Sequence, residues 1–167
     1  IVTLSGLTNG TSYTFTVVAA NSIGDGVLSS ASSAVTPATV PGAPINATAA
    51  AGNTQATVTW SGPSSTGGSV VTGYTVTASP GGQTVTVSGT TLTATFTSIT
   101  NGTSYMFTVV ATNTVGAGAS SSASNAVTPA TIPGAPINVA ATAGNKQATV
   151  TWNAPSSTGG SVITGYE

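Results

Sequence analysis

Charged side chains are nearly absent from this sequence. Its 167 residues include one Lys or Arg and two Asp or Glu, namely Asp25, Lys146 and Glu167. Charged residues make up 2% of the chain, whereas an average globular domain is roughly 25% charged. A single lysine cannot form the basic surface that nucleic acid requires, so we expect no nucleic-acid partner. We interpret each charged residue as a solvated surface side chain.

Histidine and cysteine are missing altogether. Without them the chain has no Ser-His or Cys-His nucleophile pair and no imidazole or thiolate ligand for a metal. Asp25 and Glu167 lie in different repeat units, so a paired-carboxylate site is not supported, and calcium sites usually need several carboxylates. We therefore predict a protein that is not an enzyme, with no catalytic, cofactor-binding or metal-binding residues and no cofactor.

Long hydrophobic runs are also missing. Ser, Thr, Gly and Asn interrupt every apolar stretch, and none approaches the ~18 residues of a membrane-spanning helix. We expect no membrane span in this segment. A hydrophobic share of 39% argues against disorder, and the lack of cysteine excludes a disulfide-stapled fold. The opening residues, IVTLSGL, have no signal-peptide character, and we interpret them as the interior of a longer polypeptide.

The dominant feature that the sequence does have is a long internal repeat. Residues 1–39 match residues 93–131 at 25 positions, and residues 40–75 match residues 132–167 at 27 positions, without a gap. We therefore predict three units of a tandem array. They are the C-terminal part of one repeat (1–39), a complete repeat (40–131) and the N-terminal part of the next (132–167). The partners that we expect first are neighbouring repeats of the same polypeptide.

The complete repeat has the alternation of apolar residues with Thr and Ser that is typical of half-buried β-strands. Seven of its segments alternate in this way: 44–50, 55–60, 70–78, 83–87, 91–97, 104–112 and 121–129. In the segment 91–97, the alternation places Leu92, Ala94 and Phe96 on the inner face. A repeat of this length with seven short strands indicates the all-β class and a β-sandwich.

Several motifs resemble the fibronectin type III family. Its hallmark, Leu-x-x-Leu-x-Pro-x-Thr-x-Tyr, is similar to the motif Phe96-x-x-Ile99-x-Asn101-x-Thr103-x-Tyr105 and to the earlier copy Leu4-x-x-Leu7-x-Asn9-x-Thr11-x-Tyr13. Trp60 and Trp152 stand where that family has a core Trp on its second strand. The resemblance implies tandem seven-stranded, immunoglobulin-like sandwiches, in which 1–39 supplies strands E, F and G and 132–167 supplies strands A, B and C.

The large aromatic side chains are the expected core of these sandwiches, because burying each stabilises the fold by about 1.5–3 kcal/mol. The predicted core residues are Trp60, Tyr74, Phe96, Tyr105, Phe107, Trp152, Tyr13 and Phe15. We also expect the Tyr105 hydroxyl to anchor the corner between strands E and F, as a tyrosine corner does. The loop SGPSSTGGS at 61–69 is expected to be flexible and chemically plain.

The hexapeptide TNGTSY occurs at 8–13 and again at 100–105, and it has two interpretations. Asn-Gly is a strong turn signal, and Asn-Gly-Thr is also an N-glycosylation sequon. The turn interpretation accounts for all six residues, because Asn-Gly takes the place of the hallmark Pro just before strand F and the following Thr and Tyr are those of the hallmark. Glycosylation accounts for three and requires a host that glycosylates asparagine. The two are compatible, so Asn9, Asn46 and Asn101 remain formal acceptor sites.

The segments TPATVPGAP at 36–44 and TPATIPGAP at 128–136 join the repeats. Three prolines in each favour an extended, semi-rigid connection, and a nearly uncharged surface favours self-association. Our leading interpretation is therefore a non-catalytic structural or adhesive array, extracellular or on the cell surface, that forms a stalk, fibre, sheath or matrix and takes a cell-surface or polysaccharide ligand. The alternatives are spacer modules in a secreted polysaccharide-degrading enzyme and a virus tail or decoration protein. The sequence lacks Arg-Gly-Asp, so we do not expect integrin attachment.

Overall fold

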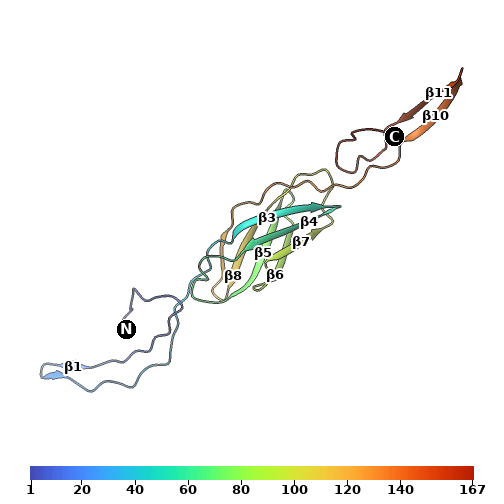
Figure 1. Ribbon diagram of the computed structural model, residues 1–167. Coiled ribbons are helices and arrows are strands. Elements are labelled where there is room, and N and C mark those ends of the chain that lie inside the picture. Colours follow the sequence, from blue (N-terminus) through green and yellow to red (C-terminus); the bar gives the residue numbers. More distant parts are fainter.

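The computed structural model describes residues 1–167 and contains β-strands but no helix. The chain is elongated (Figure 1): residues 40–131 form a β-sandwich, residues 1–39 extend from one end of it and residues 132–167 extend from the other. We call these parts the N-terminal segment, the middle repeat and the C-terminal segment. The predicted all-β fold is confirmed.

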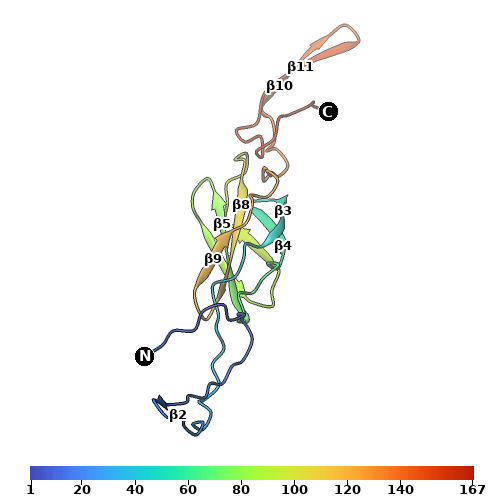
Figure 2. The same cartoon turned by 90° about the vertical axis from the view of Figure 1, so that its left-hand side faces the viewer.

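The middle repeat has seven strands in two antiparallel sheets (Figure 2), and six of them lie where the sequence predicted strands. The three-stranded sheet has the order β3–β4–β7, with bounds Ile45–Gly52, Gln55–Ser61 and Thr93–Thr97. The four-stranded sheet has the order β6–β5–β8–β9, with bounds Thr84–Ser88, Val71–Ser79, Met106–Asn113 and Ala117–Ser120.

The alternation of the strands explains where the core lies. Successive side chains of a strand point to opposite faces of the sheet, so the apolar residues of β4, β5, β7 and β8 meet between the two sheets. The buried apolar residues of these strands are Ala56, Val58, Trp60, Tyr74, Val76, Ala78, Ala94, Phe96, Phe107, Val109 and Ala111. Threonines occupy the opposite faces, and the hydroxyls of Thr48 and Thr59 lie 2.9 Å apart across β3 and β4. The sandwich therefore has an apolar interior and a hydroxyl-rich, uncharged exterior.

The strand predicted at 121–129 is wrong. β9 ends at Ser120, and the residues that follow make backbone hydrogen bonds at every third position, from Ser121 and Ser124 to β8 and from Val127 to Tyr105 just before it. The Ser121 hydroxyl accepts a hydrogen bond from the Val109 N–H at 3.0 Å, and the Ser124 hydroxyl accepts one from the Phe107 N–H at 3.1 Å. Serine side chains thus take the place of backbone carbonyls, and a regular ladder with a period of two does not form.

The predicted burial of Leu92 is also wrong. Its side chain is 43% exposed, whereas Ala94 and Phe96 are buried as the alternation requires. Leu92 lies between β7 and a turn in which the Thr91 N–H donates to the Ser88 carbonyl at 3.1 Å. The chain leaves the regular strand at this point, so the alternation no longer determines which way the side chain points.

The two flanking segments contain open hairpins. In the N-terminal segment, β1 (Ala20–Asn21) pairs with β2 (Gly24–Asp25), and in the C-terminal segment, β10 (Ile137–Gly144) pairs with β11 (Gln147–Asn153). Neither hairpin is covered by a second sheet (Figure 1). Their apolar side chains are consequently exposed.

Candidate functional site: the junctions between repeats

The charged residues do not form a site. Asp25 lies in the short strand β2, Lys146 lies in the turn between β10 and β11, and Glu167 is the last residue. All three are exposed. No group of three or more His, Cys, Asp or Glu side chains is placed to hold a metal ion, and no helix is present that has the length and hydropathy to cross a membrane.

The predicted core aromatics fall into two groups. Trp60, Tyr74, Phe96, Tyr105 and Phe107 are buried in the middle repeat, where Phe96 and Phe107 pack with their ring centres 4.8 Å apart. The buried indole N–H of Trp60 has no hydrogen-bond partner. Its ring meets the Tyr74 ring edge-on, with the ring centres 5.4 Å apart.

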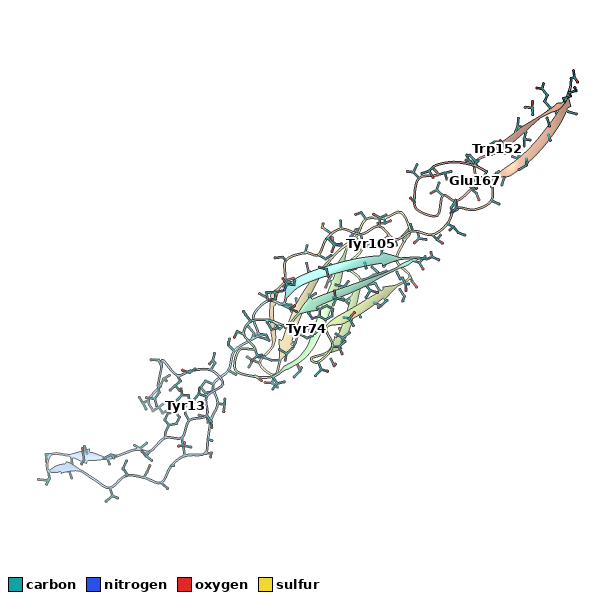
Figure 3. The ribbon with its side chains drawn as sticks, in the orientation of Figure 1. Tyr13, Tyr74, Tyr105, Trp152 and Glu167 are labelled. Atoms are coloured by element: carbon teal, nitrogen blue, oxygen red, sulfur yellow. The ribbon has the colours of Figure 1, made fainter.

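The other three predicted core aromatics lie in the flanking segments, and Figure 3 shows two of them, Tyr13 and Trp152. Trp152 is exposed in the C-terminal segment, and Tyr13 and Phe15 are half-buried in the N-terminal segment. Tyr13 and Phe15 stack at 6.3 Å, as Tyr105 and Phe107 do at 6.4 Å in the middle repeat.

The predicted tyrosine corner is confirmed. The Tyr105 hydroxyl accepts a hydrogen bond from the Thr100 N–H at 3.1 Å, and the Tyr13 hydroxyl accepts one from the Thr8 N–H at 3.0 Å. The hydrogen bond from Thr8 lowers the pKa of Tyr13 below its ordinary value, because it stabilises the phenolate. Each TNGTSY hexapeptide is therefore folded into the same corner.

The asparagine of the hexapeptide has a structural role in the middle repeat. The Asn101 side chain accepts a hydrogen bond from the Thr54 N–H and donates one to the Asn53 side chain, both at 2.8 Å. Asn9 is exposed, and Asn46 is exposed at a bulge in β3 with a φ of 56°. Glycosylation at these three asparagines stays a prediction.

Both linkers bind the following repeat in the same way. At the first junction, the Thr39 N–H donates to the Gly67 carbonyl at 2.8 Å and the Gly42 N–H donates to the Ser65 carbonyl at 2.9 Å. At the second junction, the corresponding bonds run from Thr131 to Gly159 at 2.8 Å and from Gly134 to Ser157 at 2.9 Å. The loop 61–69 is therefore not a free flexible loop, because its backbone is bonded to the linker.

Asn113, at the end of β8, links the first linker and the loop 61–69 to the four-stranded sheet. Its side-chain nitrogen donates to the Thr39 carbonyl at 2.8 Å and to the Thr66 carbonyl at 2.9 Å, and its oxygen accepts from the N–H groups of Val115 and Gly116. The residue is 4% exposed. Sequence reasoning missed this role, although the recurrence of asparagine at positions 21 and 113 was a usable signal.

A second contact joins the corner of one repeat to the loop of the next through glycines. Gly10 of the first hexapeptide lies against Gly68, and Gly102 of the second lies against Gly160. A Cβ atom built on Gly68 would lie 2.7 Å from the carbonyl carbon of Asn9, and one on Gly160 would lie 2.8 Å from that of Asn101. The backbones approach more closely than any side chain permits.

A shallow groove of about 550 Å³ runs along the first junction. It is lined by uncharged residues, among them Gly10, Pro63, Thr66 and Tyr74. Burial raises the pKa of the Tyr74 hydroxyl above its ordinary value. Such a lining offers hydroxyl and backbone hydrogen bonds but no acid, base or nucleophile activated at neutral pH.

The comparisons with known proteins agree with this architecture. Residues 41–127 match the model of the fibronectin type III domain. The chain is 40% identical over 142 residues to endoglucanase B of Cellulomonas fimi and 45% identical over 134 residues to chitinase A1 of Niallia circulans. These matches cover 79% and 75% of this chain, but only 13% and 18% of the two enzymes. A crystal structure of domains from titin is similar with a TM-score of 0.51 and 25% identity, over 60% of this chain and 36% of that one.

Proposed function

The chain belongs to the fibronectin type III domain family, and from this premise we propose that it is a non-catalytic connector in a secreted polysaccharide-degrading protein. In this role the repeats hold the parts on either side of them at a set distance and direction. With a rise of ~3.3 Å per strand residue, each repeat adds roughly 30–40 Å of length. The repeats work outside the cell, where insoluble polysaccharide is found.

The observation that carries this proposal is the recurrence of one junction geometry. Two linker hydrogen bonds and one glycine contact are repeated at both junctions with nearly equal distances. Each such hydrogen bond contributes about 0.5–1.5 kcal/mol, and the prolines of the linker restrict its backbone further. Joints of this kind transmit orientation from one repeat to the next, which a flexible Gly/Ser linker does not do.

The relatives support the choice of parent protein. Endoglucanase B and chitinase A1 each match this chain over a small part of their own length. This chain has no group of three or more His, Cys, Asp or Glu side chains that could hold a metal ion. We therefore favour a spacer in a polysaccharide-degrading protein over the free-standing stalk or fibre that the sequence alone suggested.

The test compares two forms of the polypeptide that carries these repeats. In one form the repeats are intact, and in the other a Gly/Ser linker of equal residue number replaces them. We expect hydrolysis of soluble substrate to be unchanged and hydrolysis of insoluble cellulose or chitin to fall several-fold. The isolated 167-residue chain serves as a control and should release no sugar. Equal hydrolysis of insoluble substrate by both forms, or sugar release by the isolated chain, would contradict the proposal.

A second candidate function, lateral association of the repeats into a fibre or matrix, is favoured by the outer faces of the sheets. Threonine hydroxyls pair across neighbouring strands, as in Thr57 with Thr95 at 3.4 Å and Thr75 with Thr86 at 3.5 Å. An uncharged face of this kind lacks the repulsion that keeps proteins apart. Sedimentation velocity of the chain at low and high salt tests this role. A species that stays monomeric at high concentration in both conditions would exclude it.

A further inference from the structure

The contact between corner and loop is built from glycine on both of its sides. At the first junction Gly10 presents its backbone to Gly68, and a Cβ on Gly10 would lie 3.1 Å from the Gly68 Cα. The second junction repeats this contact between Gly102 and Gly160 at 3.2 Å. Real Cβ contacts are seldom this close, so a side chain on Gly10 or Gly102 requires its neighbour to shift by a few tenths of an ångström, and a Cβ on Gly68 or Gly160 would overlap the preceding corner outright.

The neighbouring loop glycine makes a different contact. A Cβ on Gly67 would lie 2.9 Å from the Thr39 carbonyl carbon, and one on Gly159 would lie 2.8 Å from that of Thr131. The first glycine of each pair therefore faces the linker, and the second faces the corner of the preceding repeat. Both positions must be glycine, because the linker backbone packs against the first and the backbone of the preceding corner packs against the second.

Hydrogen bonds fix the conformation of each Asn-Gly corner that makes this contact. The Asn101 side chain ties the corner to the turn after β3, and the Gly102 N–H donates to the Pro129 carbonyl at 2.9 Å. The Gly10 N–H donates to the Pro37 carbonyl at the same distance. In both copies the glycine of the Asn-Gly turn leaves space for the next repeat and its N–H is bonded to the following linker, and in the middle repeat the Asn101 side chain adds support.

We propose that the Asn-Gly corner and the Gly-Gly loop are the two halves of a recognition surface through which each repeat accepts the next. Its partner is a second copy of the same module, and a module with a side chain at either loop glycine cannot dock in this geometry. The inference rests on the proposed connector role, because it names the contact that sets the direction of the rod. It also predicts which modules can follow one another: a module with Gly-Gly in this loop can follow a module with Asn-Gly at its corner.

The experiment measures the orientation of the N-terminal segment against the middle repeat in the full 167-residue chain. The chain has no native cysteine, so Thr14→Cys and Thr84→Cys, both at exposed positions, carry two spin labels. Gly68→Ala tests the contact, and Gly82→Ala is the matched control, because Gly82 also has a positive φ but no atom within 4 Å of a built Cβ. Since domains without a tight interface move freely, Gly68→Ala should broaden the distance distribution by about twofold. Gly82→Ala should leave it unchanged, and equal widths in the two variants would overturn the proposal.

A second pair of variants keeps the proposal testable if Gly68→Ala unfolds the middle repeat. Gly10→Ala alters the contact from the corner side, and Gly6→Ala is its control, with φ values of 82° and 80° and open space only at Gly6. Broadening by Gly10→Ala alone supports the recognition surface, and equal distributions contradict it. Sugar release by the unaltered chain would contradict the connector role but would not change the distance distributions. A failure of the connector role can therefore be distinguished from a failure of the recognition surface.

Discussion

The same pair of aromatic residues is buried in one part of the molecule and exposed in another. In the middle repeat, Trp60 and Tyr74 meet at 5.4 Å with an angle of 61°, and Trp60 is 5% exposed. In the C-terminal segment, Trp152 and Tyr166 meet at 5.4 Å with an angle of 58°, but Trp152 is 43% exposed. Local sequence therefore sets the geometry of the pair, whereas the second sheet determines its burial.

The tyrosine corners show the same separation of geometry from burial. Tyr13 and Tyr105 accept equivalent hydrogen bonds, at 3.0 Å and 3.1 Å, yet only Tyr105 is buried. Matched substitutions in the two regions should therefore have unequal effects on stability. Four comparisons follow from this, from the largest expected effect to the smallest.

The largest difference is expected between Trp60→Ala and Trp152→Ala. Removing a buried aromatic side chain costs about 3–5 kcal/mol, so Trp60→Ala should lower the stability of the middle repeat by that amount. Trp152→Ala should cost less than about 1 kcal/mol, because its side chain already contacts water. Urea unfolding followed by circular dichroism measures both. Equal losses would mean that the two aromatic pairs are buried alike in solution.

Asn113→Ala should be the next most costly change. It leaves the Thr39 and Thr66 carbonyls without their donor at a part-buried site, a loss of about 1–3 kcal/mol. Asn21→Ala removes only bonds within the exposed loop that follows β1, to the N–H groups of Ile23 and Gly24. It should therefore have little effect on the unfolding midpoint of the middle repeat. An Asn113→Ala variant with an unchanged midpoint would show that the linker is not fastened at this point.

Tyr105→Phe should have a smaller effect, because it removes one hydroxyl and keeps the ring. The Thr100 N–H then loses its partner at a half-buried site, which costs about 0.5–1.5 kcal/mol. Tyr13→Phe makes the same change where water can replace the hydroxyl, so its cost should be close to zero. Thermal melting of both variants checks this order, and a larger loss for Tyr13→Phe would reverse the conclusion.

The fold was predictable from sequence wherever side chains alternate regularly. Six of the seven strands lie within two residues of their predicted bounds at each end, because apolar and Thr residues alternate throughout them. The seventh was misplaced, because serine hydroxyls at positions 121 and 124 replace backbone acceptors and give a spacing of three. That spacing is visible in the sequence, but it does not resemble a strand.

The junction was not predictable from local pattern. Gly10 and Gly68 meet although 57 residues separate them in the chain, and a glycine pair in isolation is equally typical of a flexible loop. The Asn-Gly turn was identified, but its second role depends on a neighbouring repeat that turn chemistry does not describe. The available clue was that Asn-Gly at the corner and Gly-Gly in the loop both recur at the repeat spacing, at Gly10 with Gly68 and at Gly102 with Gly160.

The last comparison concerns two tyrosines whose pKa values shift in opposite directions. Burial raises the pKa of Tyr74, and the Thr8 hydrogen bond lowers the pKa of Tyr13. In an unfolded chain both ionise near pH ~10. Above that pH the unfolded state loses the Tyr74 proton while the folded state keeps it, so the stability of the middle repeat falls as the pH rises through the folded pKa. The lowered pKa of Tyr13 has the opposite sign and adds stability to its corner once the phenolate forms.

Ultraviolet titration of tyrosinate in Tyr74→Phe and Tyr13→Phe variants separates the two. Tyr13→Phe should remove the earliest part of the titration curve and Tyr74→Phe the latest. In unfolding experiments between pH 7 and pH ~11, Tyr74→Phe should flatten the alkaline loss of stability of the middle repeat, whereas Tyr13→Phe should leave that loss unchanged. If the two hydroxyls titrate together, Tyr74 is as well hydrated as Tyr13. The contrast between the closed middle repeat and the open N-terminal segment would then not extend to their tyrosines.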